Sequence, residues 1–389
     1  MRVLINLEHR FYKYNDAIYD DTTYNADFFK PYVESFGNVV VLARVKEISL
    51  ITDKFQRVDI DNISFFELPD YNRYSFLYVI PKIIISLCRI RINDYDAVIL
   101  RKPCRIGRLL SFLKLNSNSN YLIEYLGDMF DIAALKTSFI SRYYAYLIAF
   151  WEKKQIKKAP IVTYVTKRYL QSHFPCGSSS KSFSWSDVML ERKLFVVKKI
   201  EKLNSCYTFI YTASFSKYKG HHYLPEIFKK LHLEGYQWKL VLIGDGVERK
   251  YIESKFLEYG INNHVEFTGN IPNNIVRSYL AKADVYISTS LTEGLPRAIL
   301  EAMACSLPVV AFSVGGINEL IDSKYLTKSG EISKMLDIIK MLYMDIDFFE
   351  SASRNNYYTA QMYNVDSMKS SRLASYEALK QMVYKNKCK

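Results

Sequence analysis

The stretch Ala283–Gly316, ADVYISTSLTEGLPRAILEAMACSLPVVAFSVGG, decides the fold of this protein. It opens with an apolar run, Asp284–Thr289, that predicts a buried strand. Pro296 suits the first turn of a helix, since its φ is fixed near the helical value, and good helix formers follow over Arg297–Cys305. A second apolar run, Leu307–Phe312, predicts the next strand. Together they form a β-α-β unit, whose first loop lies at the carboxyl end of a strand, where open α/β sheets bind ligands.

Two carboxylates of this stretch, Glu293 and Glu301, are candidate binding groups. Glu293 lies in the loop before the helix, so this acid and the amides at the helix N-terminus can bind a sugar hydroxyl and an adjacent phosphate. Glu301 lies on the helix and can accept the two hydroxyl donors of a ribose diol. Spacing alone favours a simpler interpretation, in which Glu293 complements the helix dipole and Glu301 faces solvent. The longer string around them argues against it.

The string TEGLPRAILEAMACSLPVVAFSVGGINELI resembles the nucleotide-sugar signature of retaining glycosyltransferases of family four, which have the GT-B fold. The match runs unbroken through Glu293, Glu301, Pro308 and Gly315–Glu319. The resemblance implies that Glu293 contacts the donor sugar and that Glu301 binds the nucleotide ribose. It also implies a transfer that retains the anomeric configuration, with no metal and no cofactor beside the nucleotide diphosphate sugar that serves as donor.

At 389 residues, of which 49% are hydrophobic, the chain suits two globular domains. The resemblance implies an α/β, GT-B architecture, in which two doubly wound, Rossmann-like domains face a central cleft. We place an acceptor-binding domain at residues 1–185, a linker at 186–206 and a nucleotide-sugar-binding domain at 207–365. The last segment, 366–389, is predicted to be a helix that returns to pack on the first domain.

In the predicted second domain, the loop ASFSKYKG (213–220) follows the strand Thr208–Thr212. The resembled family usually has a Gly-Arg pair and then a Lys-Gly pair here, and their cations neutralise the donor diphosphate as charge develops on the leaving group. Lys219-Gly220 matches, whereas Ala213-Ser214 replaces the Gly-Arg pair. Either Lys217 substitutes for the missing cation or Lys219 acts alone. Further donor-binding candidates lie in this loop and its neighbours: Ser214, Gly244, Gly269, Ile271, Gly294 and Leu295.

The first domain fits the resemblance in layout rather than in motifs. A strand over Arg2–Leu7 leads to Glu8-His9-Arg10-Phe11, a polar cluster expected at its carboxyl end. A nicotinamide-binding site is excluded here, because the G-x-G-x-x-G that it needs is absent. A later strand, Tyr121–Tyr125, ends at Gly127-Asp128, where the resembled family often has a His. Asp128 either orients the acceptor hydroxyl or caps the following helix, and we place the acceptor near His9 and Asp128.

Three further observations narrow the function. Asp59-Ile60-Asp61 has the D-x-D spacing of metal-dependent glycosyltransferases of the other large fold, but short acidic matches are common by chance. The six cysteines form no C-x-x-C pair and no metal-ligand pattern, which indicates reduced thiols in a cytosolic protein. The N-terminus, MRVLINLEHRF, is too short and polar for a signal peptide, and the apolar runs are too short to span a bilayer.

The formal net charge of +13 is concentrated in the middle of the chain. Residues 101–200 hold 18 Lys/Arg against 6 Asp/Glu, whereas residues 251–350 hold 8 against 13. Within the basic region, the aromatic segment Phe139–Ala159 contains four lysines: Lys153, Lys154, Lys157 and Lys158. Aromatic rings and clustered lysines suit an anionic membrane surface. The alternative, one core face followed by a solvated basic end, is slightly favoured by the pattern alone.

We therefore expect a glycosyltransferase that moves a sugar to a glycan or lipid-linked glycan acceptor, in the synthesis of a capsule, O-antigen or exopolysaccharide. We expect it in the cytoplasm, in peripheral contact with the inner face of the cell membrane and without a nucleic-acid partner. Two alternatives stay open. An inactive, membrane-docked partner subunit of the same fold would explain the missing Arg at Ser214. A nucleic-acid-binding protein would explain the charge, although no motif for it is present.

Overall fold

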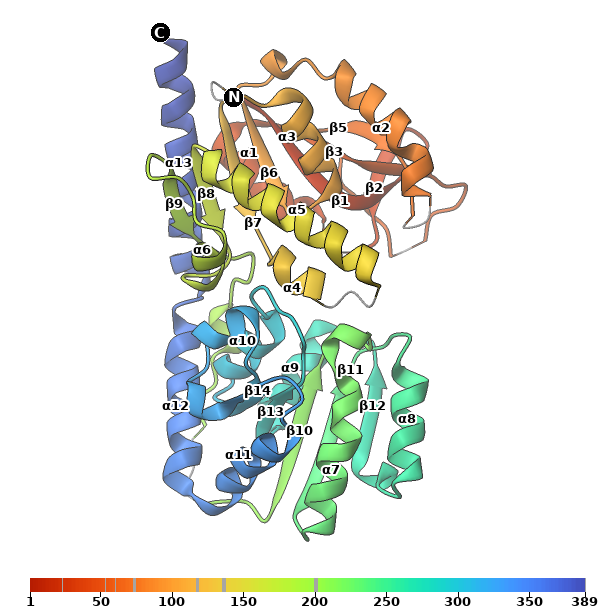
Figure 1. Ribbon diagram of the computed structural model, residues 1–389, viewed down its shortest axis with the longest axis vertical. Coiled ribbons are helices and arrows are strands. Elements are labelled where there is room, and N and C mark those ends of the chain that lie inside the picture. Colours follow the sequence, from red (N-terminus) through yellow and green to blue (C-terminus); the bar gives the residue numbers. More distant parts are fainter. Residues whose placement is uncertain are drawn as a thin grey trace.

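The computed structural model describes residues 1–22, 24–52, 54–59, 61–72, 75–116, 119–134, 138–198 and 202–388. Ile60, the central residue of the D-x-D triplet, and residues 199–201 of the predicted linker lie outside these ranges. The chain forms two α/β domains, one above the other in Figure 1, each built on its own sheet. Strand β9 of the first sheet ends at Ser184, and strand β10 of the second begins at Cys206.

The first sheet has a parallel core in the order β5-β3-β1-β6-β7-β8-β9. Strand numbers rise in both directions from the neighbours β1 and β6, so this pair is the topological switch point of the sheet. Two short antiparallel strands, β2 and β4, extend the sheet from the far end of β1. The strands are β1 (Arg2–Tyr14), β2 (Ala17–Asp20), β3 (Asn38–Glu47), β4 (Gln56–Arg57), β5 (Ile63–Pro69), β6 (Ala97–Lys102), β7 (Tyr121–Tyr125), β8 (Ile161–Tyr164) and β9 (Lys181–Ser184).

The first strand is longer than the sequence predicts. β1 continues to Tyr14, so Glu8–Phe11 lies within the strand rather than after its end. The pairing of β1 with β3 changes register between Asn6 and Arg10, which marks a bulge at this polar cluster. Asn15 and Asp16, with φ of 47° and 61°, then reverse the chain into β2. This tight turn lacks the glycine that marks most such hairpins, so its pattern gives only a weak signal.

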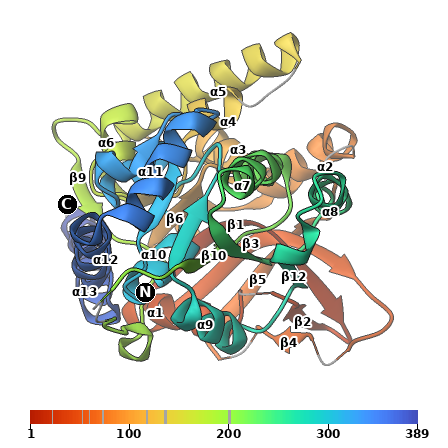
Figure 2. The ribbon, with the colours of Figure 1, turned by 90° about the horizontal axis from the view of Figure 1, so that it is seen from below.

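Helices cover both faces of the first sheet (Figure 2). Alternate residues of each strand point to opposite faces and enter two separate cores. Residues such as Leu4 and Leu100 pack with α2, α3 and α5, whereas Val3 and Ile99 pack with α1 and α13. The helices of this domain are α1 (Ala26–Phe36), α2 (Phe76–Arg89), α3 (Arg105–Lys114), α4 (Met129–Ala134), α5 (Phe139–Lys158) and α6 (Tyr169–His173).

The second sheet is parallel throughout, in the order β12-β11-β10-β13-β14-β15. The order reverses between β10 and β13, so the loops that follow these two strands meet at the carboxyl edge of the sheet. The strands are β10 (Cys206–Thr212), β11 (Gln237–Ile243), β12 (Val265–Gly269), β13 (Val285–Ser288), β14 (Val309–Phe312) and β15 (Leu326–Thr327). The helices are α7 (Leu224–Leu233), α8 (Arg249–Glu258), α9 (Asn273–Lys282), α10 (Arg297–Ala304), α11 (Ile332–Met344) and α12 (Ile346–Gln361).

The last helix, α13 (Val365–Lys387), runs from the second domain along the side of the first (Figure 1). It contacts α1, β8 and β9, and its Tyr376, Leu379 and Val383 are buried in the core on that face of the first sheet. The two domains are therefore joined twice, by the segment after β9 and by this helix.

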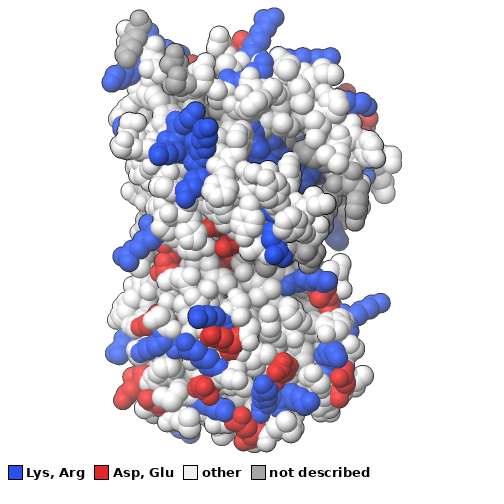
Figure 3. Space-filling view, viewed as in Figure 1, with Lys and Arg blue, Asp and Glu red and all other residues white. Residues whose placement is uncertain are grey.

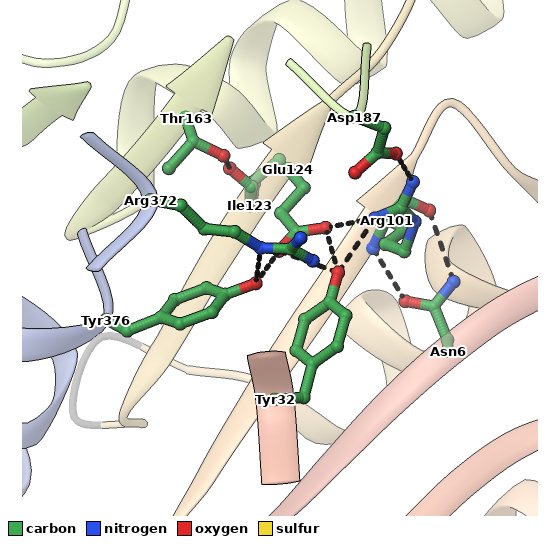
Figure 4. A network of polar contacts seen from close by, with 9 residues as sticks. All are labelled: Asn6, Tyr32, Arg101, Ile123, Glu124, Thr163, Asp187, Arg372 and Tyr376. Carbon is green, nitrogen blue, oxygen red and sulfur yellow. Dashed lines mark hydrogen bonds and ion pairs between the residues drawn. The ribbon is translucent and has the colours of Figure 1, made fainter. Parts of the chain in front are cut away.

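A buried charge network holds α13 in place (Figure 4). Arg101, at the end of β6, donates from Nη1 to Glu124 on β7 at 2.7 Å, and its Nη2 pairs with Asp187 in the segment after β9. The Tyr376 hydroxyl of α13 donates to Glu124 at 3.1 Å, and Arg372 Nε donates to Tyr376 at 3.0 Å. Burial raises the pKa of Glu124, although Arg101 and Arg372 oppose that shift. The network thus joins four segments of the chain: β6, β7, the segment after β9, and α13.

Glu124→Gln is expected to lower the free energy of unfolding by about 3 kcal/mol, because it removes the charge of a buried ion-pair partner while Asp187 still faces Arg101. Urea titration followed by circular dichroism measures the loss. Glu377→Gln, which removes an exposed acid of α13 that pairs with Lys380, is the matched control and should leave stability unchanged. Equal stability of Glu124→Gln and the wild type would contradict the role assigned to the network.

Candidate active site

A cavity of about 660 Å³ lies between the two domains. The first domain contributes Gly127, Asp128 and Ile132, from the end of β7 and from α4. The second domain contributes the segments 217–219 and 291–294, which follow β10 and β13. The volume lies within the range of small-molecule binding sites. The second-domain wall is formed by the loops after β10 and β13, the two strands at the switch point of that sheet.

Glycines allow the loops of this wall to approach one another closely. Gly220 has φ of 67°, and a Cβ at this position would lie 1.9 Å from the carbonyl oxygen of Thr289. Gly315 has φ of 51°, and a Cβ there would lie 1.8 Å from the carbonyl oxygen of Glu293. Any other side chain would force these loops apart, since neither the backbone conformation nor the space admits one.

This approach brings Lys219 and Glu293 into contact. The Lys219 ammonium donates to Glu293 Oε1 at 2.6 Å, and the Ser290 hydroxyl donates to the same oxygen at 2.7 Å. Tyr211 holds the other side of the loop by donating from its hydroxyl to the Lys219 carbonyl at 2.7 Å. The two side chains predicted for the donor diphosphate and the donor sugar therefore form one ion pair in the cavity wall, and both keep some exposure, 19% and 14%.

The carboxylate of Glu301, half-buried on α10, forms no hydrogen bond or ion pair with any other residue that the structure describes. Burial raises the pKa of its carboxyl group, while Arg297 and Arg277 oppose this shift. A half-buried carboxylate with both oxygens free is suited to accept hydroxyl donors from a ligand. It does not itself line the 660 Å³ cavity.

The other predicted donor-binding residues lie along the same carboxyl edge. Lys217 is exposed and lines the cavity with Lys219, and Gly294 lines it beside Glu293. Gly244 directly follows β11, and Gly269 is the last residue of β12. The Gly244 N–H donates to the Gly269 carbonyl at 3.0 Å. Three more are half-buried or exposed outside the cavity lining: Ser214, Ile271 and Leu295.

In the first domain, the structure separates the two predicted acceptor residues. Asp128 lines the cavity and also caps α4, since it accepts from the Phe130 N–H at 2.6 Å. The helix cap predicted for Asp128 is therefore present, and its role toward an acceptor stays a prediction. His9 is not among the cavity residues: its Nε2 pairs with Asp20 at 2.5 Å, and its ring packs on Phe11 and Tyr24. The extension of β1 explains this, because His9 lies within the strand rather than in a loop.

Two groups near the site are missed by the sequence reasoning. His173, on α6, pairs through Nδ1 with Asp128 at 2.6 Å, so a histidine from a different element does stand beside the end of β7. Glu319 crosses between the domains and accepts from the backbone N–H groups of Lys167 and Arg168, at 2.8 Å each. Glu319 ends the match to the family signature described above, which was a usable signal. His173 has no such signal, because its proximity to Asp128 depends on the tertiary fold.

Comparisons with known proteins agree with this geometry. Residues 195–358 match the model of the family described as glycosyl transferases group 1. Protein CapJ of Staphylococcus aureus is 26% identical over 358 residues, which cover 92% of this chain and 90% of CapJ. The putative teichuronic acid biosynthesis glycosyltransferase TuaC of Bacillus subtilis is 37% identical over 82 residues, 21% of this chain and 19% of TuaC. The structure of Anabaena HepE in complex with UDP and glucose matches with a TM-score of 0.66 and 17% identity, covering 97% of this chain and 100% of HepE.

Two doubly wound domains with a cavity between their carboxyl edges define the GT-B class, as predicted. Over residues 195–358 the chain is similar to the glycosyl transferases group 1, which agrees with the resemblance found in the sequence. Within the described ranges, no helix combines the length and the apolar composition needed to cross a membrane.

A buried histidine supports the Lys219 loop. His221 directly follows Gly220, is 1% exposed and is stacked between Phe215 and Tyr211, with ring centroids 4.2 and 4.7 Å away. Neither of its ring nitrogens has a hydrogen-bond partner in the described structure. Burial, together with the neighbouring Lys219, lowers the pKa of His221 to about 3. The imidazole is therefore neutral in the folded protein.

His221→Phe is expected to reduce the sensitivity of the fold to acid. In the unfolded chain this histidine has a pKa near 6.5, whereas in the folded protein its pKa is about 3. Below pH 6.5 the unfolded state therefore binds a proton that the folded state does not, and the free energy of unfolding falls as the pH is lowered toward 3. Between pH 7 and pH 5, the variant should lose about 2 kcal/mol less unfolding free energy than the wild type. Urea titrations at both values measure this difference. His232→Phe, at an exposed position, is the control, and parallel pH profiles for His221→Phe and the wild type would refute the assignment.

Proposed function

We propose that this protein transfers a sugar from a nucleotide diphosphate sugar to a glycan or lipid-linked glycan acceptor. The observation that carries the proposal is the Lys219–Glu293 pair in the wall of the interdomain cavity, with the free carboxylate of Glu301 on the adjoining helix. A cation, a sugar-binding acid and a ribose-binding acid on one switch-point edge match the three parts of such a donor.

In this function, the donor diphosphate lies against Lys219 and Lys217. Both lysines line the cavity, and a fixed cation stabilises the charge that develops on the nucleotide as the glycosidic bond breaks. Glu293 accepts from a hydroxyl of the sugar and keeps Lys219 oriented. The N-terminus of α10 lies immediately after Gly294 and Leu295, so its amides favour negative charge at this position. Ser214 leaves the diphosphate without the usual arginine, and Lys217 takes its place.

The acceptor approaches from the first domain. Asp128 is the acid on that wall of the cavity, and its carboxylate is held by the Phe130 N–H and by His173. It orients the acceptor hydroxyl across the cavity from Glu293. We propose retention of the anomeric configuration and no metal requirement, with nucleotide departure assisted by the lysines and the helix amides rather than by a protein nucleophile. TuaC, by its name, acts in teichuronic acid biosynthesis, which supports a cell-surface polysaccharide as the product class.

The exposed side of α5 supports contact with an anionic membrane. Aromatic and aliphatic side chains along it are 49–82% exposed: Phe139, Ile140, Tyr143, Tyr144, Leu147 and Phe150. They do not form the core face that the pattern alone favours; the core contacts of α5 are made by residues such as Ala149 and Ile156. The last turn of the helix carries exposed lysines. In Figure 3, blue side chains gather beside uncharged surface over the region where α5 crosses the front of the first domain.

A thermal-shift panel of UDP, GDP, ADP and CMP tests the donor site. One diphosphate should raise the stability, by about 2.7 kcal/mol at 100 times its Kd, because it binds only the folded state. Glu301→Ala and Lys219→Ala should each weaken that binding roughly 10- to 100-fold, the worth of a hydrogen bond to a charged group. Glu258→Ala, an exposed acid of the same domain, is the matched control.

Assays of sugar transfer by the wild type and by Glu293→Gln distinguish an active enzyme from an inactive partner subunit. This variant should still bind the diphosphate but lose transfer, and chelator should leave wild-type transfer unchanged. No shift with any nucleotide would contradict the donor site. Binding without transfer in the wild type would instead favour the inactive-partner alternative.

Co-sedimentation with vesicles tests the membrane contact. The wild type should bind vesicles that contain anionic lipid and not neutral ones, and salt should weaken the binding. Tyr143→Ser, Leu147→Ser and Phe150→Ser combined should release it, because these exposed side chains supply the apolar contact. The control carries Leu233→Ser, Val247→Ser and Leu257→Ser, three apolar residues of the second domain that are at least as exposed. Equal binding of the two triple variants would refute a role for α5.

A further inference from the structure

A second cavity, of about 740 Å³, lies in the first domain between α3 and α5. Its deep wall is apolar, since Leu100 of β6 and Ile123 of β7 line it and are otherwise buried in the sheet core. Phe112 of α3 and Trp151 of α5 line its sides, with ring centroids 6.4 Å apart. It shares no lining residue with the interdomain cavity, so it is a separate site.

The basic end of α5 borders this cavity. Lys154, Lys157 and Lys158 line it and are exposed, and none of them forms an ion pair with another described residue. Glu152, which is the only acid on α5, is turned inward and pairs with the buried Lys102 and with Arg108. No described carboxylate thus pairs with these three lysines, and they are accessible to an external anion.

Two polar side chains that line the cavity, Ser111 and Gln155, are engaged by the protein itself. Ser111 and Gln155 both contact the Nζ of Lys102, and Ser111 also donates to the carbonyl of Arg108 at 3.1 Å. A ligand of this site therefore meets apolar carbon inside and free ammonium groups at the opening. That distribution matches an amphiphile with a hydrocarbon tail and an anionic head.

We infer that this cavity takes one acyl chain of an anionic bilayer lipid, with the headgroup phosphate bound by Lys154, Lys157 and Lys158. The inference rests on the membrane contact proposed above and does not depend on the glycosyl transfer. The outward side of α5 is continuous from its exposed aromatic residues to these lysines, so one face of the helix contacts the bilayer while its last turn withdraws a lipid chain into the domain.

Tryptophan fluorescence gives a direct test, because the chain has three tryptophans and only Trp151 lies in the cavity wall. Trp185 and Trp238 are 3% and 2% exposed. The probe is 11-bromoundecanoate below its micelle concentration, a single anionic chain whose terminal bromine quenches tryptophan on contact. Saturable quenching at one chain per protein is expected, and Trp151→Phe should abolish it without loss of secondary structure by circular dichroism.

Charge variants of the lysines complete the test. Lys154→Gln, Lys157→Gln and Lys158→Gln combined should weaken binding to anionic vesicles about 100-fold, on the order of 1 kcal/mol per lysine, and should weaken the quenching as well. Lys239→Gln, Lys250→Gln and Lys282→Gln, at exposed positions of the second domain, are the matched control. Absence of saturable quenching in the wild type, or equal quenching in the two triple variants, would overturn the inference. If vesicles bind but the single chain does not quench, the cavity site fails while the membrane contact stands.

Discussion

The close contact between two loops at the switch point of the second sheet is the constraint on which the site depends. Gly220 lies against the carbonyl of Thr289 and Gly315 lies against the carbonyl of Glu293, at separations that admit no side chain. Only because the loops touch can Lys219 and Glu293 form their 2.6 Å pair, although they are far apart in the chain. The pair is supported by Ser290, which donates to Glu293, and by Tyr211, which donates to the Lys219 carbonyl. The His221 ring stacks on Tyr211. The geometry of the candidate site is thus set by backbone packing.

The first domain is organised around buried charge rather than close backbone contact. Glu124 receives hydrogen bonds from Arg101, Tyr32 and Tyr376, which belong to β6, α1 and α13 (Figure 4). Charges this deep are stable only when all partners are present, so the returning helix is needed to complete the first domain. The neighbouring strand end carries Asp128 to the cavity. The position of the cavity wall that carries Asp128 therefore depends on residues from both ends of the chain.

Much of the second domain could be predicted from the sequence, because its signals are local. The β-α-β stretch, the Lys219-Gly220 pair and the acids Glu293 and Glu301 each follow from a short string. The first domain offered weaker signals. The extension of β1 begins at a bulge and ends in a turn without glycine, so the position predicted for His9 did not match the structure. His173 reaches Asp128 only through the tertiary fold. The aromatic residues of α5 could not be assigned from periodicity, since both sides of that helix are apolar and only packing shows which side is covered.

The hydrogen bonds of Glu319 link the opening of the cleft to the structure of the first domain. The Glu319 carboxylate belongs to the second domain, yet it accepts from the N–H groups of Lys167 and Arg168, just before α6 of the first domain, and from that of Tyr169, the first residue of α6. The same short helix carries His173. Widening the cleft must break these charge-assisted hydrogen bonds and remove the cap of α6 at the same time. The orientation of His173 toward Asp128 is then coupled to how far the domains are apart. In such an arrangement, opening of the cleft loosens the wall that carries Asp128, and closing it orders that wall again.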